Sequence, residues 1–130
     1  TRTFALRSVN AEMQDLHDIV REANATASGG IRAGMRGRDA DFLARGYIDR
    51  KGHGDAFGHS LGHGIGLEVH EGPRLARTAE PPLPAGAVVT IEPGIYRPGW
   101  GGVRIEDDVH LTSDGPEVLT KFPRELMVIG

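Results

Sequence analysis

The stretch of sequence that decides the fold of this chain is Gly58-His59-Ser60-Leu61-Gly62-His63-Gly64-Ile65-Gly66-Leu67-Glu68-Val69-His70-Glu71. It contains three of the six histidines of the chain, together with four glycines. Imidazole binds metals and exchanges protons near neutral pH, and glycine lets the backbone bend until such groups converge. A helix is disfavoured, because each interior glycine costs a helix about 1 kcal/mol relative to alanine. We therefore predict a loop that enters a strand. If His63 and His70 share a site, the chain must kink between them.

The composition limits the functions that are open to the chain. Its 130 residues favour a single domain. The net charge of −3 gives no electrostatic case for binding nucleic acid or an anionic membrane, and no apolar run reaches the roughly 20 residues of a transmembrane helix. Because the chain has no cysteine, a metal site must use nitrogen and oxygen ligands, which favours Mn, Co, Fe or Zn. Cytoplasm is the simplest compartment for such a chain.

Hydrophobic periodicity divides the chain into a helical half and a strand-rich half. Residues 1–9 end a strand, and Asn10 caps a helix that runs to about Ala27. A second helix is predicted over 39–51, with Gly52 at its C-terminal end. Further strands are predicted at 67–70, 88–92, 103–111 and 126–129. We expect the helices to be scaffold and their charged residues to be a solvated surface, namely Arg36, Arg38, Asp39 and Asp41.

Two glutamates lie on strands that a turn at 98–102 connects. Strand alternation places Glu92 on the polar face of the first strand, and Arg104 and Glu106 on the polar face of the second. If the hairpin is symmetric about Gly99, Glu92 lies opposite Glu106 with Cβ atoms about 5 Å apart. Like charges repel there, so either one carboxylate is protonated, Arg104 neutralises the pair, or a cation lies between them. Together with His63, the pair favours a metal site with a three-ligand shell.

Residues 59–71 resemble the proline-peptidase signature of the pita-bread metallopeptidases, a family that includes Xaa-Pro aminopeptidase and Xaa-Pro dipeptidase (prolidase). Residues 90–96 and 102–108 resemble two further blocks of that family in the same order, and the resemblance covers essentially the whole chain. It implies an α+β fold, the second half of a pita-bread (creatinase/aminopeptidase) fold, in which two helices pack on a curved antiparallel sheet. Residues 1–130 would be the C-terminal half of the catalytic domain.

The resemblance also implies a chemistry, the metal-dependent hydrolysis of the Xaa-Pro peptide bond by two divalent ions, manganese or cobalt. Three of the five protein ligands would be His63, Glu92 and Glu106, with Glu106 bridging the ions. The substrate would be a peptide with proline at its second position. The implied catalytic residues are His59, His70, Glu92 and Arg104.

Each implied catalytic residue has its own role. Glu92 would carry the proton of the attacking water, and Arg104 would orient the carboxylate ligands. His59 and His70 would contact the scissile carbonyl and stabilise the tetrahedral intermediate. The ions would lower the pKa of the attacking water and stabilise the developing oxyanion.

The other two ligands of the family are aspartates on a preceding hairpin, and neither has a counterpart here. The first aspartate of the chain is Asp15, on a predicted helix. We therefore expect the chain alone to be inactive, with reduced or no metal occupancy. Its partner would be the missing N-terminal half or a second copy in a homodimer. A non-catalytic binding module of the same fold and a creatinase-like hydrolase are the alternatives.

Overall fold

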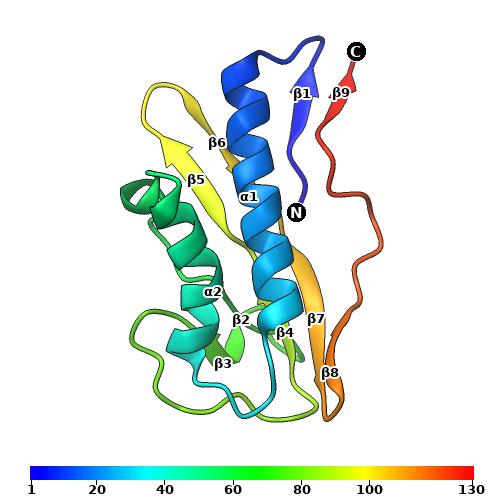
Figure 1. Cartoon of the computed structure of the whole chain (residues 1–130). Helices are drawn as coiled ribbons and strands as arrows, with labels where there is room; N and C mark the ends of the chain where they lie inside the picture. The colour runs from blue at the N-terminus through cyan, green and yellow to red at the C-terminus, as the bar shows by residue number, and fades with distance from the viewer.

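The structure, a computed structural model, describes all of residues 1–130. Two helices, α1 (Ala11–Gly30) and α2 (Gly37–Arg50), and the short 3-10 helix η1 (Gly54–Ala56) follow the first strand (Figure 1). The strands are β1 (Phe4–Leu6), β2 (Gly62–Gly64), β3 (Glu71–Leu75), β4 (Val88–Ile91), β5 (Gly94–Arg97), β6 (Gly101–Arg104), β7 (Asp107–Thr112), β8 (Gly115–Val118) and β9 (Met127–Ile129). Neither helix is both long enough and apolar enough to cross a membrane.

The two predicted helices are confirmed, with small shifts at their ends. The side chain of Asn10 caps α1 by accepting a hydrogen bond from the Met13 N–H at 2.8 Å. The helix continues past Ala27 to Gly30, and Ile31 is its C-terminal cap. Gly52 follows α2 with a φ of +83°, a conformation that glycine adopts without strain.

The strands form one large sheet and two small ones. The large sheet has the order β3-β2-β4-β7-β8, and all its neighbouring strands are antiparallel. Strands β5 and β6 form an antiparallel pair, and strands β1 and β9 form a parallel pair. In Figure 1 both helices lie in front of the large sheet. The α+β fold, with two helices packed on an antiparallel sheet, is therefore confirmed.

The hairpin around Gly99 has the predicted symmetry. Val88 pairs with His110 in β4–β7, and Arg97 pairs with Gly101 in β5–β6. Both ladders therefore share one register, and they are separated by an interruption. The predicted strand 103–111 is for this reason two strands, β6 and β7.

The predicted strand at 67–70 is wrong. Leu67 is fully exposed, and the segment is a bend between β2 and β3. The Gly66 N–H donates to the Glu68 carbonyl at 3.3 Å, so the backbone turns where the apolar alternation suggested an extended chain. The structure also differs from the predicted loop around His63, because Gly62–Gly64 forms β2, and β5 was not predicted. Strands β3 and β8 were not predicted either. Each contains a proline, which is tolerated because both lie at edges of the sheet.

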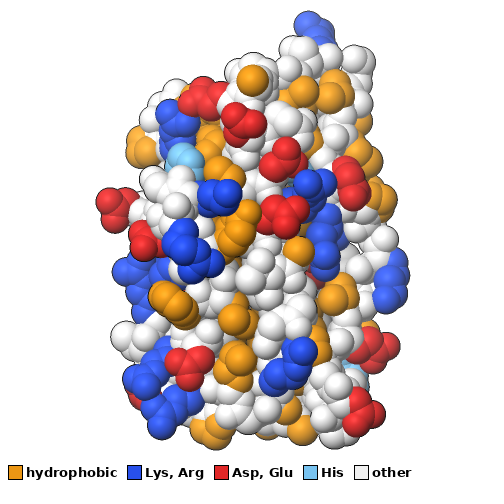
Figure 2. All heavy atoms as spheres, viewed as in Figure 1, with side chains coloured by type: hydrophobic (Ala, Val, Ile, Leu, Met, Phe, Trp, Pro, Cys, Tyr) orange, Lys and Arg blue, Asp and Glu red, His pale blue; other side chains and the backbone are white.

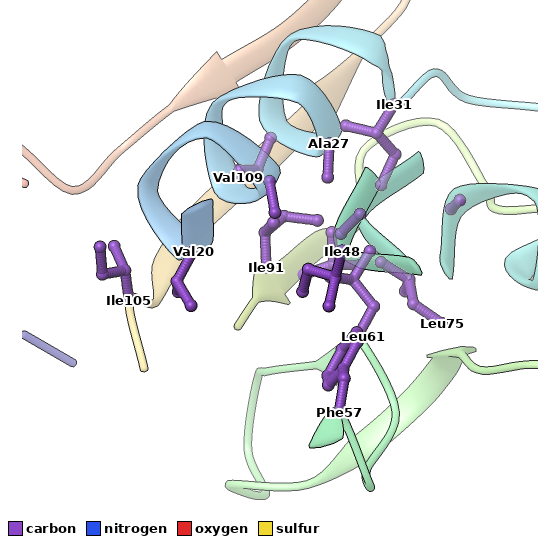
Figure 3. Close-up of a cluster of buried hydrophobic side chains, with 14 of the residues drawn as sticks. Val20, Ala27, Ile31, Ile48, Phe57, Leu61, Leu75, Ile91, Ile105 and Val109 are labelled. Carbon is purple, nitrogen blue, oxygen red and sulfur yellow. The ribbon is translucent and has the colours of Figure 1, made fainter. Parts of the chain in front are cut away.

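The hydrophobic core fills the space between the helices and one face of the sheet. Figure 3 shows α1 side chains meeting those of α2 and the strands, and all the labelled residues are at most 1% exposed. On the outer face of the helices, acidic and basic side chains are interspersed (Figure 2). Since Val89 and Ile91 of β4 point into this core, Thr90 and Glu92 point to the opposite face. The polar residues of the site are on that face.

Candidate active site

His63 lies on β2, between β3 and β4 in the sheet, and is flanked by two glycines whose replacement would force the neighbouring backbone to move. A Cβ atom on Gly62 would be 1.8 Å from the Thr90 carbonyl oxygen, and one on Gly64 would be 2.0 Å from the Gly72 carbonyl oxygen. The register of β2 against β3 shifts between His63 and Gly64. After this shift the chain returns, and the rings of His63 and His70 lie with their centroids 4.4 Å apart. The predicted kink is confirmed.

The centre of the site is the contact between His63 and Glu92. His63 Nε2 lies 3.2 Å from Glu92 Oε1. His63 Nδ1 lies 2.8 Å from the Gly64 carbonyl oxygen, which can only accept, so Nδ1 carries a proton. In neutral imidazole Nε2 is then an acceptor that faces a carboxylate oxygen. Two acceptors at this distance require a proton or a cation between them.

Thr90 fixes both partners of this contact. Its Oγ1 accepts the His63 backbone N–H at 3.1 Å and donates to Glu92 Oε1 at 3.0 Å. Thr90 was not among the predicted site residues. Strand alternation could have found it, because Thr90 is two residues before Glu92 and shares its face.

Arg104, Tyr96 and His59 form a chain of hydrogen bonds. Arg104 Nη1 donates to the Tyr96 hydroxyl at 3.4 Å, and the hydroxyl lies 2.7 Å from His59 Nε2. His59 Nδ1 donates to the Ser60 carbonyl at 2.8 Å, so both its ring nitrogens are engaged. The hydrogen bond to Tyr96 raises the pKa of Arg104 against the effect of burial, with help from Glu106 and Glu92. Arg104 is therefore a permanent cation, and its Nε is buried without a partner. Tyr96 was also missed.

Glu106 is turned toward the start of the chain. Its carboxylate accepts a short hydrogen bond from the Thr1 hydroxyl and lies 3.4 Å from the Thr1 amino group. Burial raises the pKa of the Glu106 carboxyl, but Thr1 and Arg104 outweigh burial and hold that pKa below its usual value. Glu106 does not line the cleft around His63. No three His, Asp or Glu side chains are arranged to hold a metal ion.

The α2 helix holds the loop that carries His59, through a buried ion pair. Asp41 and Arg45 form a bidentate pair with N–O distances of 2.6 and 2.8 Å. Arg45 also donates to the Phe57 and His59 carbonyls, each at 2.8 Å, and Asp41 accepts the Leu61 N–H at 3.0 Å. The prediction that Asp41 belongs to a solvated surface is wrong, since it is 1% exposed. Its partners lie up to 20 residues away in the sequence.

The site residues surround a cleft of about 520 Å³ on the sheet face away from the helices. It brings together His59, His63, His70, Glu92 and Arg104 of the predicted set. Ser60, Gly62, Glu71, Gly72 and Arg74 complete its lining. The donor chemistry of the His63–Glu92 pair fits part of a shell for a divalent ion, since Mn²⁺, Co²⁺ and Zn²⁺ accept imidazole and carboxylate.

Known proteins are similar to this chain over nearly all of its length. The Xaa-Pro dipeptidase of Pyrococcus furiosus is 48% identical over 127 residues, which are 98% of this chain and 36% of that protein. An Xaa-Pro dipeptidase structure from Bacillus anthracis is similar with a TM-score of 0.96 and 52% identity, over 98% of this chain and 36% of the other. An X-Pro aminopeptidase structure from Thermotoga maritima gives a TM-score of 0.95 and 47% identity with the same coverage. The chain thus spans about a third of the length of its relatives.

The sequence model of metallopeptidase family M24 matches residues 1–113 of this chain, and this range contains every residue of the predicted site. This match and the similarity to the Xaa-Pro peptidases support each other, because they rest on the same segment. The chain therefore belongs to metallopeptidase family M24.

Proposed function

We propose that the complete protein containing this chain is a metal-dependent peptidase that hydrolyses the Xaa-Pro bond of peptides with proline at the second position. The observation that carries the proposal is His63 Nε2 facing Glu92 Oε1 at 3.2 Å, with Nδ1 committed to a carbonyl. The similarity to an Xaa-Pro dipeptidase and an X-Pro aminopeptidase favours this reaction over that of a creatinase-like hydrolase.

His63, Glu92 and Glu106 would hold the metal, with manganese or cobalt as the ion and two ions in the complete site. Divalent ions in such a site supply a nucleophilic water at neutral pH and electrostatic stabilisation of the developing oxyanion. The bond from Thr90 holds the Glu92 carboxylate in a fixed orientation, from which it can accept a proton and pass it on. Thr1 occupies only Oε2 of the Glu106 carboxylate, so Glu106 would bind the ion through Oε1 or after losing its contacts with Thr1.

Of the remaining residues, the two histidines would act on the substrate and Arg104 on the carboxylates. His70, whose ring lies against that of His63, would donate to the carbonyl oxygen of the scissile bond. His59 can do so only after exchanging its bond to Tyr96 for one to the substrate. Arg104, always charged and with an unpartnered Nε, would orient the carboxylates, and it helps to hold the pKa of the Glu106 carboxyl below its usual value.

The isolated 130-residue chain is proposed to be inactive, because its arrangement lacks a three-ligand cluster and it spans about a third of its relatives. The rest of the complete protein, or a second copy of the chain, would supply further carboxylates. A surface for such a partner is offered by β1 and β9, where Phe4, Leu6, Val128 and Ile129 are 44–69% exposed.

An assay of Xaa-Pro dipeptide and oligopeptide hydrolysis with Mn²⁺ or Co²⁺ tests the proposal. We expect negligible turnover by the isolated chain, and turnover by the complete protein that Glu92→Gln removes, since glutamine cannot carry the proton. The matched control is Glu117→Gln, on an exposed glutamate of β8, which should leave turnover unchanged. Full activity in Glu92→Gln would contradict the assigned role, and turnover by the isolated chain would contradict its proposed inactivity.

A further inference from the structure

A buried amide on α1 joins the two strands that carry the predicted glutamate ligands. Asn24 is completely buried, and its Nδ2 donates to the Ile91 carbonyl at 3.0 Å and to the Ile105 carbonyl at 3.2 Å. Carbonyls only accept, so the orientation of the amide is fixed by its partners. Ser28, also buried, donates to Asn24 Oδ1 at 3.5 Å. Asn24 therefore spans both strands of the hairpin from a single position in the helix.

The Ile105 carbonyl needs this donor because of Pro93. The shared register of the two ladders places Pro93 opposite Ile105. The Ile105 N–H donates to the Pro93 carbonyl at 3.4 Å, but proline has no N–H with which to return the bond. The ladder is interrupted here, between β4 and β5 on one arm of the hairpin and between β6 and β7 on the other arm. A buried carbonyl without a donor is costly, and Asn24 supplies the missing one.

The interruption lies at the glutamates of the candidate site. Glu92 directly follows Ile91, and Glu106 directly follows Ile105, so each carbonyl bound by Asn24 belongs to the peptide unit that leads into a glutamate. The same register makes Glu92 and Glu106 opposite residues that share no backbone hydrogen bond, since the Glu92 N–H donates to the Leu61 carbonyl at 2.8 Å and the Glu106 N–H to the Thr1 carbonyl at 3.0 Å.

We propose that Asn24 is a positioning residue, which sets the separation and direction of Glu92 and Glu106 by fixing the peptide units before them. Its link to metal binding rests on the function proposed above, whereas its effect on the backbone does not. An apolar side chain would suffice if packing alone were needed, as Val20 shows one turn earlier on the same helix. Figure 3 shows Val20 between Ile91 and Ile105, at the point where α1 crosses the hairpin.

Amide hydrogen exchange of the metal-free chain tests the positioning role directly. In Asn24→Leu we expect hydrogen exchange at the Glu92 and Glu106 amides to accelerate at least about tenfold. This factor corresponds to the lower part of the range of free-energy costs for a buried polar group that loses its hydrogen-bond partner. The Leu111 amide, in the same hairpin but away from Asn24, reports any general loss of stability. If the Asn24→Leu variant does not fold, Asn24→Ala replaces it in the same measurement. Val20→Ala is the matched control, because it opens the same helix–hairpin contact without removing a hydrogen bond.

A second variant tests the mechanism. Pro93→Ala restores an N–H opposite Ile105, so the double variant with Asn24→Ala should recover at least half of the lost protection at Glu106. If exchange at both glutamates is no faster in the Asn24 variants than in Val20→Ala, relative to Leu111, Asn24 does not position them. Failure of Pro93→Ala to restore protection would also overturn the proposal.

Binding of Mn²⁺ alone distinguishes this inference from the proposed function. We expect the Asn24 variants to bind Mn²⁺ at least about fivefold more weakly than Val20→Ala, since misplaced carboxylates coordinate poorly. These affinities are measured in the complete protein: if it and its His63→Ala variant bind Mn²⁺ equally, the metal function fails, while the exchange result still decides the role of Asn24. If Mn²⁺ binds through His63 and the Asn24 variants bind as well as Val20→Ala, the positioning inference fails alone.

Discussion

At the scale of single residues, the two histidines of the segment that opens the site are oriented in the same way. His59 and His63 each donate from Nδ1 to the carbonyl of the following residue, at 2.8 Å in both cases. This bond selects the tautomer and leaves Nε2 directed away from the backbone. Nε2 of His59 then meets the Tyr96 hydroxyl, and that of His63 meets Glu92. One local hydrogen-bond pattern thus produces one histidine that is held and one that is available as a ligand.

His17 is a residue that should make the stability of the chain depend on pH. Burial on α1 lowers its pKa below 6.5, and Nδ1 has no hydrogen-bond partner. The unfolded chain therefore binds more protons than the folded chain below about pH 6.5, so stability falls as the pH falls through that value. Urea unfolding between pH 7.5 and 5.5 should show a smaller loss of stability in His17→Leu than in the unaltered chain. Equal losses in both proteins would contradict the assignment.

At the scale of elements, β2 is packed so closely between β3 and β4 that neither of its glycines has room for a side chain. Gly62→Ala would place a Cβ atom against the backbone of β4, and Gly64→Ala would place one against the backbone of β3. We expect each variant to lose at least about 3 kcal/mol in the free energy of unfolding, a large effect that is typical of mutations that strain or disrupt a core. Gly58→Ala is the control, because its Cβ would have nothing within 4 Å. Chemical denaturation measures both. A Gly62→Ala chain as stable as Gly58→Ala would mean that β2 is not packed between its neighbours.

Local sequence patterns predicted the helices and strands better than they predicted the contacts between them. The Asn10 cap and the symmetry about Gly99 could be predicted because both depend on residues close in sequence. Asp41 was taken for a surface residue because the backbone groups it holds come from a distant loop. Asn24 gave no signal at all, since its importance depends on a proline 69 positions later in the sequence. In the site, the histidines and glutamates could be identified by type and spacing, whereas Thr90 and Tyr96 act through hydrogen bonds that three-dimensional packing creates.

At the scale of the whole molecule, the exposed apolar residues of β1 and β9 predict association. Leu6 is 69% exposed and Val128 is 49% exposed, on a two-stranded parallel sheet with open edges. Contiguous apolar surface and unpaired strand edges favour association. Sedimentation velocity over a range of concentrations should show the isolated chain associating, and Leu6→Lys with Val128→Lys should reduce the association. A monomer at high micromolar concentration would contradict this prediction.

The whole fold also places the cleft on the sheet face opposite the helices, with one His–Glu pair at its centre. A second such pair exists elsewhere, since His110 Nδ1 lies 3.4 Å from Glu117 Oε2 on the exposed edge of the sheet. The two pairs have similar spacing. They differ in that the His63–Glu92 pair is oriented by Thr90 and the Gly64 carbonyl.

The most direct test of the central claim is a titration of the ¹⁵N-labelled chain with Mn²⁺, followed by paramagnetic broadening of its amide resonances. We predict that resonances of His63 and Glu92 broaden at the lowest Mn²⁺ concentration, that His110 and Glu117 require several times more, and that His63→Ala abolishes the early broadening. Broadening that begins at His110 and Glu117, or that survives unchanged in His63→Ala, would contradict a metal site at His63 and Glu92.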